Sequence, residues 1–284
     1  MLELKLVANK MAISIMSEMI KNEDKRKENE TEEDVIKKSE EEIKQDCELN
    51  ASKRLLPKFR KSYPRLPIRI IADSLYPSIG LIELCEKENV EYIFVLKDKK
   101  IPTLIEEFLT LVSLPTGNRE IKETKEKIIL TLWENNIDYK GKKINVIRQI
   151  TKNKETEKYS KWMWITNREI TRKNLSKIIY CARTRDYIEN QGFREQKITS
   201  GIDLEHVYSK DIKAIKVIYI IIQITHLILQ IIEHSDICGN FNKKYGSVKV
   251  FRRKFYAHLT ETELNIELIQ IKIQIRFDKS LMIY

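Results

Sequence analysis

Residues 68–114 constrain the fold of this chain most strongly, because two kinds of apolar pattern alternate along them. Residues 68–73 (IRIIAD) and 91–96 (EYIFVL) are short apolar runs, which are typical of buried strands. Residues 80–89 and 101–114 follow them with the apolar spacing of a helix. Strand, helix, strand and helix with short connections predict a parallel pair of strands in an α/β core.

Two polar residues stand where these predicted strands end. Asp73 closes the first strand, and Lys97 follows the second. In parallel sheets, chemistry is located beyond the carboxyl ends of the strands. An acid at this position is therefore a candidate for a catalytic role, although capping of the next helix explains an Asp there equally well.

The period of the apolar pattern changes from helical to alternating between residues 115 and 170. Three strand-like runs are joined there by polar turns: residues 128–133, 144–150 and 162–165. We therefore predict an all-β insertion that ends before a helix starting near Asn174. Trp162 and Trp164 alternate on one of these strands, and packing in the core explains them better than stacking on DNA bases.

Residues 181–197 (CARTRDYIENQGFREQK) combine a helical pattern with a high density of charge. The helical stripe that approaches this segment is apolar and then becomes ionic. Arg185 and Glu189 share one face if the segment is an α-helix. This pattern fits an ordinary surface ion pair, and it also fits a carboxylate held at the edge of a core.

The chain carries a large excess of positive charge. It contains 52 Lys and Arg against 42 Asp and Glu, which gives a formal net charge of +10. Such a balance favours a polyanionic partner. Basic and aromatic residues also alternate in the tail, residues 236–284, where contact with phosphates and a solvated helix face are both open interpretations.

Cysteine usage and the apolar runs indicate a cytoplasmic protein. The four cysteines are widely separated and match no metal-ligand spacing, so we expect reduced thiols. The first residues alternate Leu with charged residues and do not resemble a signal peptide. The most apolar run, residues 217–232, is interrupted by Gln223, His226 and Gln230 and is shorter than the roughly 20 residues of a membrane span. We therefore predict a buried core helix there and no membrane partner.

Five segments, taken in order, resemble one family. They are residues 44–51 (KQDCELNA), 71–99 (IADSLYPSIGLIELCEKENVEYIFVLKDK), 164–178 (WITNREITRKNLSKI), 181–197 and 204–230 (LEHVYSKDIKAIKVIYIIIQITHLILQ). Along nearly the whole chain, these segments are similar to the DDE transposases of bacterial insertion sequences. Five matches in sequence order are a far more specific signal than any one of them.

The resemblance implies an α/β fold, an RNase H-like mixed sheet flanked by helices, with the all-β insertion before the catalytic helix. On this basis the chain divides into four parts: residues 1–114 form the first part of the core, 115–170 the β-rich insertion, 171–235 the catalytic helix and the long core helix, and 236–284 a basic C-terminal tail.

The resemblance also implies roles for individual residues. Asp73 takes the place of the second catalytic Asp and Glu189 that of the catalytic Glu, and both would hold Mg²⁺ or Mn²⁺ for phosphoryl transfer by two metal ions. The DNA-binding residues implied or suggested alongside them are Arg185, Lys197, Arg183 and Lys97.

Two departures from the family pattern bear on activity. The family carries a further Asp on the first strand of its sheet, and this sequence begins after that position, so we expect an N-terminally truncated copy. Asp186 stands where relatives carry a large aromatic residue, so an acid there would add negative charge beside the site or leave a packing gap.

Three hypotheses follow. The first is an active transposase that acts on transposon ends and target DNA, with a homo-oligomer left open as a further partner. The second is a remnant that binds DNA without catalysis. The third, which the sequence favours least, is an interaction protein that does not bind nucleic acid. We expect a transposase with impaired or no activity.

Overall fold

The computed structural model describes residues 1–8, 11–20, 40–97, 100–199, 204, 206, 208–234, 245–261 and 263. The chain divides into two compact units. Unit 1 comprises Met1–Leu2 and Met16–Arg185, and unit 2 comprises Glu3–Ile15 and Asp186–Tyr284. Each unit is described by itself. A final strand suggested by the alternating pattern of residues 269–277 lies outside the described residues.

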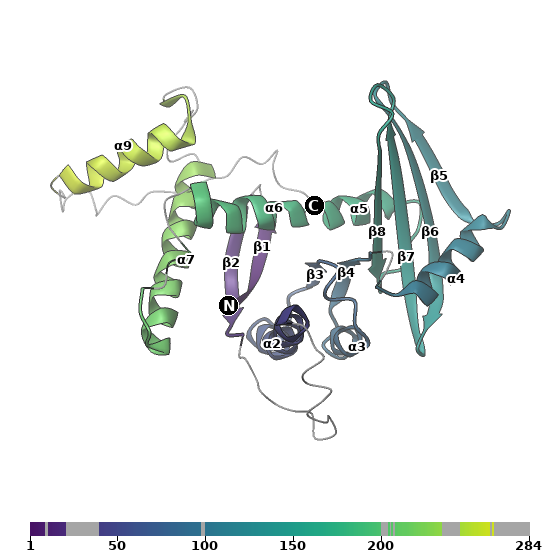
Figure 1. Cartoon of the computed structure of the whole chain (residues 1–284), viewed down its shortest axis with the longest axis horizontal. Helices are drawn as coiled ribbons and strands as arrows, with labels where there is room; N and C mark the ends of the chain where they lie inside the picture. Colours follow the sequence, from purple (N-terminus) through teal and green to yellow (C-terminus); the bar gives the residue numbers. More distant parts are fainter. Residues whose placement is uncertain are drawn as a thin grey trace, which may run out of the picture. The chain divides into compact units, whose positions relative to one another are not determined.

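Unit 1 is built on a six-stranded mixed sheet (Figure 1). Its strands, in spatial order, are β3 (Arg69–Ala72), β4 (Glu91–Val95), β8 (Tyr159–Thr166), β7 (Lys142–Asn153), β6 (Lys127–Tyr139) and β5 (Asn118–Glu123). β3 and β4 pair in parallel, and every other neighbouring pair is antiparallel. The predicted parallel pair is therefore confirmed, within a mixed α/β fold.

Four helices accompany this sheet, with bounds close to those predicted: α2 (Glu40–Ser62), α3 (Ile79–Lys87), α4 (Pro102–Ser113) and α5 (Leu175–Arg183). The sequence pattern predicts that the helix containing α2 begins near residue 31, but residues 21–39 lie outside the described part of the chain. Alternation in residues 2–6 and a β-like run at residues 12–19 predict two strands at the start of the sequence. Both are present, as β1 (Leu2–Ala8) and β2 (Met11–Glu18), and they form a separate two-stranded sheet.

The alternating segment does not form a sheet of its own. β8 pairs with β4 through Phe94 opposite Ile165 and Val95 opposite Trp164. The predicted β insertion therefore continues the sheet begun by β3 and β4, and it leaves β3 as an edge strand. The turn predicted around Gly141 joins β6 to β7, with positive φ angles of 52° at Lys140 and 78° at Gly141, as tight hairpin turns require.

The sheet buries apolar residues on both faces, because successive side chains of a strand point to opposite sides. On the first face, Phe94, Ile144 and Ile165 belong to a core that includes residues of α3 and α4. On the second face, which we call the α5 face, Ile147 and Trp164 belong to a smaller core. Leu175, Ile178 and Ala182 of α5 complete that second core at helical spacing.

Unit 2 contains most of the β1–β2 sheet, a π-helix η1 (Ile188–Thr199), the long helix α7 (Ile212–His234) and α9 (Val248–Glu261). By length and composition alone α7 could cross a membrane, a test that core helices of soluble proteins also pass. The prediction of a buried apolar helix is wrong for its apolar residues: Ile220, Ile221 and Ile224 are about half exposed. The fully buried side chains of α7 are instead Tyr219, His226 and Gln230.

Gly117 lies where the chain leaves α4 for β5, and a side chain there has no room. A Cβ atom would lie 2.5 Å from the carbonyl oxygen of Val112, which is backbone and does not yield easily. We predict that Gly117→Ala lowers the free energy of unfolding by about 1–3 kcal/mol, measured by urea unfolding. Gly80→Ala is the control, because its Cβ would meet only the end of the Lys53 side chain at 3.4 Å. Equal losses in both variants would contradict the steric argument.

Glu18 at the end of β2 binds two cations of α2. Its carboxylate accepts hydrogen bonds from Arg54 Nε at 3.1 Å and Lys58 Nζ at 2.5 Å. Burial alone would raise the pKa of Glu18, but the hydrogen bonds and charges of Lys58 and Arg54 outweigh it, so this pKa lies below its ordinary 4.5. A lowered pKa in the folded state stabilises the fold above the ordinary pKa, and this stabilisation is lost as the pH falls through the lowered value.

We therefore predict that Glu18→Gln destabilises the protein at pH 7 by about 1–3 kcal/mol, because the nearly buried carboxylate that accepts from Arg54 and Lys58 loses its charge. The difference from the wild type should shrink as the pH falls below 4.5. Thermal unfolding between pH 3 and pH 7 measures this difference in stability between the variant and the wild type. Glu120→Gln is the control, because its ion pair with Lys122 is largely exposed. A difference for Glu18→Gln that does not depend on pH would refute the assignment.

Candidate functional site

Asp73 follows β3 directly, at the carboxyl end of the parallel strand pair. Its Oδ1 accepts a hydrogen bond from the backbone N–H of Leu75 at 2.8 Å, which closes the turn after the strand. The side chain is half-buried. Lys97 lies at the same end of the pair, beyond β4, and is exposed. Asp73 thus has a local structural role that engages one of its two carboxylate oxygens.

A second acid lies near this strand end. Tyr76 donates a hydrogen bond from Oη to Oε1 of Glu48, a residue of α2, at 2.5 Å. Burial, this bond and the negative charges of Glu48 and Asp73 together raise the pKa of Tyr76. The sequence of residues 44–51 gave no indication of a role for Glu48. No spacing rule links a residue of α2 to a turn after β3, so only the packed structure shows the connection.

Arg183 ends α5 and lies over the α5 face of the sheet. Its Nη2 donates a hydrogen bond to Oε1 of Gln149 at 2.6 Å. Its guanidinium carbon lies 5.6 Å from the ring centroid of Trp162 and 5.8 Å from that of Trp164. The two indoles stack with centroids 6.0 Å apart. Trp164 is buried, as predicted for core packing, whereas Trp162 is half-buried and contributes to the platform beneath Arg183.

The segment that carries Glu189 departs from the predicted α-helix. Arg185 lies in a short helix, α6 (Arg185–Tyr187), and Glu189 lies in η1, whose hydrogen bonds run from residue i to i+5. A regular i, i+4 face therefore does not describe their relation. Glu189, Asp186 and Lys197 are exposed, and Arg185 is half-buried. The exposed Asp186 leaves no packing gap, and the place of Glu189 at the edge of a core stays a prediction.

η1 is anchored to α7 by buried amides. Gln196 is fully buried, and its Nε2 lies 2.8 Å from Oε1 of Gln223 and 2.9 Å from Nδ1 of His226. Gln223 returns a hydrogen bond to Oε1 of Gln196 at 3.2 Å. Polar groups buried in this way are stable only because they bind one another. The three residues that interrupt the apolar run of α7 include two that hold η1 in place.

A buried ion pair lies beside η1 on the β1–β2 sheet. Lys5 and Glu3 pair at 2.5 Å, and their side chains are 0% and 1% exposed. A Cβ atom on Gly192 of η1 would lie 3.0 Å from the Lys5 side chain, so Gly192 permits the close approach of the two elements. Within unit 2, η1 is therefore fixed on two sides.

Within either unit, the described residues do not bring together the metal centre that the resemblance implies. No group of three or more His, Cys, Asp or Glu side chains converges in the described part of the chain. Asp73 belongs to unit 1 and Glu189 to unit 2, which are described separately, and one oxygen of Asp73 is engaged by Leu75. Mg²⁺ needs several oxygen ligands at one point, and neither unit by itself gathers three such side chains among the described residues.

No protein-family model matches the chain, and no match was found among the curated proteins. The function must therefore be argued from the residues themselves.

We predict that Gln196→Leu destabilises unit 2, because the buried His226 and the half-buried Gln223 lose their hydrogen bonds to Gln196. The expected loss is about 1–3 kcal/mol. We expect the amide hydrogens of η1 and α7 to exchange faster in the variant than in the wild type. Lys197→Gln, an exposed neighbour on the same helix, should leave exchange unchanged. Unchanged exchange in Gln196→Leu would show that the amide network does not hold η1.

Proposed function

We propose that this chain is a DDE-type transposase with an RNase H-like core that binds DNA, and in which cleavage and joining of strands are impaired or lost. One observation carries the proposal: an acid, Asp73, lies at the carboxyl end of a parallel strand pair in a strongly basic chain. Further support comes from the order of the elements, since antiparallel strands and then a basic helical segment follow this pair.

Binding is supported better than cleavage. In two-metal phosphoryl transfer, carboxylates must converge on one point to hold the ions. The described residues gather Asp73 and Glu48 near Tyr76, without a third ligand. Binding asks less of the chain, because exposed cations suffice to neutralise phosphates. Arg183, Arg185, Lys197 and Lys97 are the residues that we assign to this task.

The alternative is an active transposase that works on transposon ends and target DNA with Mg²⁺ or Mn²⁺. The resemblance to DDE transposases favours this alternative as well. The two hypotheses differ only in whether the protein cleaves and joins DNA strands. A protein that does not bind nucleic acid would differ from both, because the excess of positive charge would then serve another purpose.

Fluorescence anisotropy with a labelled DNA duplex tests the binding. We expect binding at low salt that weakens steeply as salt rises, since each neutralised phosphate releases counterions. Asp73→Asn keeps an acceptor for Leu75 and removes one negative charge, so it should bind DNA at least as tightly as the wild type. Absence of binding at low salt would overturn the proposal.

A nicking assay on supercoiled DNA with Mg²⁺ or Mn²⁺ tests the loss of cleavage. We expect no nicking above that of a sample in which Asp73→Asn and Glu189→Gln are combined. Nicking by the wild type that disappears in the double variant would establish the active transposase instead. DNA binding by both proteins serves as the control for folding.

A further inference from the structure

The α5 face of the sheet extends beyond the helix that covers it. Along β7, side chains at alternate positions share this face, and they change from the apolar Ile147 to the polar Gln149, Thr151 and Asn153. The residues opposite them on β6 and β8 change in the same direction, from Trp133 and Trp164 to Lys127 and Ser160. α5 ends at Arg183, above Gln149. Beyond that point the sheet presents a largely polar surface, and no helix among the described residues of unit 1 covers it.

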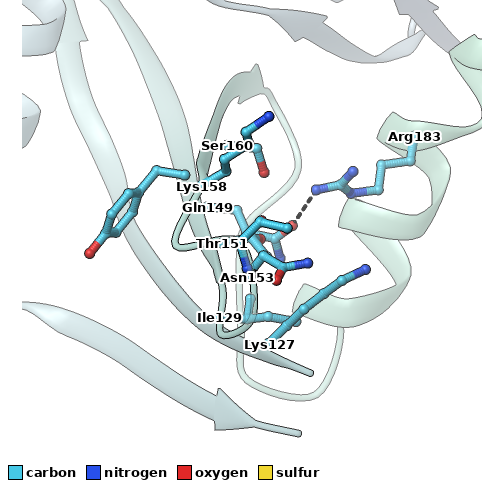
Figure 2. A pocket seen from close by; sticks show the side chains of 10 residues that line it. Lys127, Ile129, Gln149, Thr151, Asn153, Lys158, Ser160 and Arg183 are labelled. Carbon is cyan, nitrogen blue, oxygen red and sulfur yellow. Dashed lines mark hydrogen bonds between the residues drawn. The ribbon is translucent and has the colours of Figure 1, made fainter. Parts of the chain in front are cut away.

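An open hollow of about 440 Å³ lies on this uncovered surface (Figure 2). Three cations line it: Lys127 from β6, Lys158 from the β7–β8 turn, and Arg183 from α5. Gln149, Thr151 and Ser160 add polar groups between them. The lining contains no Asp or Glu. We call this hollow the β-face pocket.

The positive charge of the β-face pocket is not neutralised locally. None of its three cations has a carboxylate within ion-pair distance among the described residues, whereas two nearby lysines, one on β7 and one in the β7–β8 turn, do. Lys152 pairs with Glu157, and Lys154 pairs with Glu123. Glu157 and Glu123 are thus engaged by other lysines. The lining itself holds three cations and no acid, and this balance attracts an anion.

Arg183 is held in place before any ligand arrives. Figure 2 shows its guanidinium reaching toward Gln149, whose Oε1 accepts one of the five N–H groups. Trp162 and Trp164 support the planar group through cation–π contacts. A guanidinium that is fixed in this way has donors left to bind two phosphate oxygens at once.

The cations are spread along the sheet. Lys127 is paired with Asn153, and the backbone carbonyl of Lys158 accepts a hydrogen bond from Asn153 N–H. Arg183 binds Gln149, four residues earlier on the same strand. At about 3.3 Å per residue, the two ends lie about 13 Å apart along β7. That span exceeds a single phosphate ion and matches several phosphates of a nucleic-acid strand, which follow one another at about 3.4 Å along the axis.

We propose that the β-face pocket binds the phosphodiester backbone of DNA, with Lys127 and Lys158 at one end and Arg183 at the other. The proposal rests on DNA binding as the function of the chain and adds a site that neither Asp73 nor Glu189 defines. The contacts are to phosphates, so they position DNA and do not read its sequence.

Charge removal with a matched control tests the site. Lys127→Gln combined with Lys158→Gln removes two exposed charges from the pocket. Lys140→Gln combined with Lys161→Gln removes two exposed charges elsewhere on the same sheet. Lys161 lies on the opposite face of β8, opposite Ile150, and Lys140 lies in the β6–β7 turn. Both variants have the same net charge, so any difference between them reports position.

In anisotropy titrations, the pocket variant should bind DNA roughly fivefold more weakly than the control variant. Its slope of log K against log salt should be shallower by about 2, because two phosphate contacts are lost. Arg183→Lys keeps the charge and loses the planar fork, so it should weaken binding roughly threefold with little change in slope. Circular dichroism confirms folding of each variant.

The outcomes separate this proposal from the one on which it rests. If the wild type does not bind DNA at all, the proposed function fails. If the wild type binds and the pocket variant matches the control variant, the β-face pocket is not the site and the proposed function stands. Inorganic phosphate should compete no better than chloride at equal ionic strength. Stronger competition that disappears in the pocket variant would identify a site for a single ion and overturn the assignment to DNA.

Discussion

The backbone pairing of β4 with β8 is the interaction on which the rest of unit 1 depends. It joins a parallel pair to four antiparallel strands and so creates one sheet with two buried faces. α3 and α4 pack on one face, and α5 packs on the other. Because α5 lies against β4 and its neighbours, this pairing also determines where Arg183 emerges over the sheet.

Much of unit 1 could be predicted from the sequence, because its signals are local. The apolar runs ending at Asp73 and Lys97 identified the parallel pair, and alternation identified β6, β7 and β8. The pairing of β8 with β4 could not be predicted, since it joins residues about 70 positions apart by backbone bonds that no side-chain pattern encodes. The β-face pocket escaped prediction for the same reason, because its lining combines residues from three strands and a helix.

The candidate site was less predictable than the fold. Asp73 lies at the expected strand end, but Glu48 reaches Tyr76 from a distant helix. In the sequence of α7, polar residues interrupt the apolar run and therefore do not indicate a buried position. In the structure, His226 is nevertheless buried, and it binds Gln196. Hydrophobicity alone assigns such residues to the surface. A buried polar group that is fully bonded belongs inside, and its partner is visible only in three dimensions.

The π-helical form of η1 makes this segment sensitive to its length. Each turn closes over one residue more than in an α-helix, so successive side chains are distributed differently around the axis. Removing or adding one residue between Glu189 and Gln196 would rotate the following residues about the helix axis. A different side chain would then face α7, although Gln196, Gln223 and His226 themselves were unchanged. In a surface loop such a change is absorbed locally. In η1 the number of residues therefore decides whether Gln196 can reach Gln223 and His226 of α7.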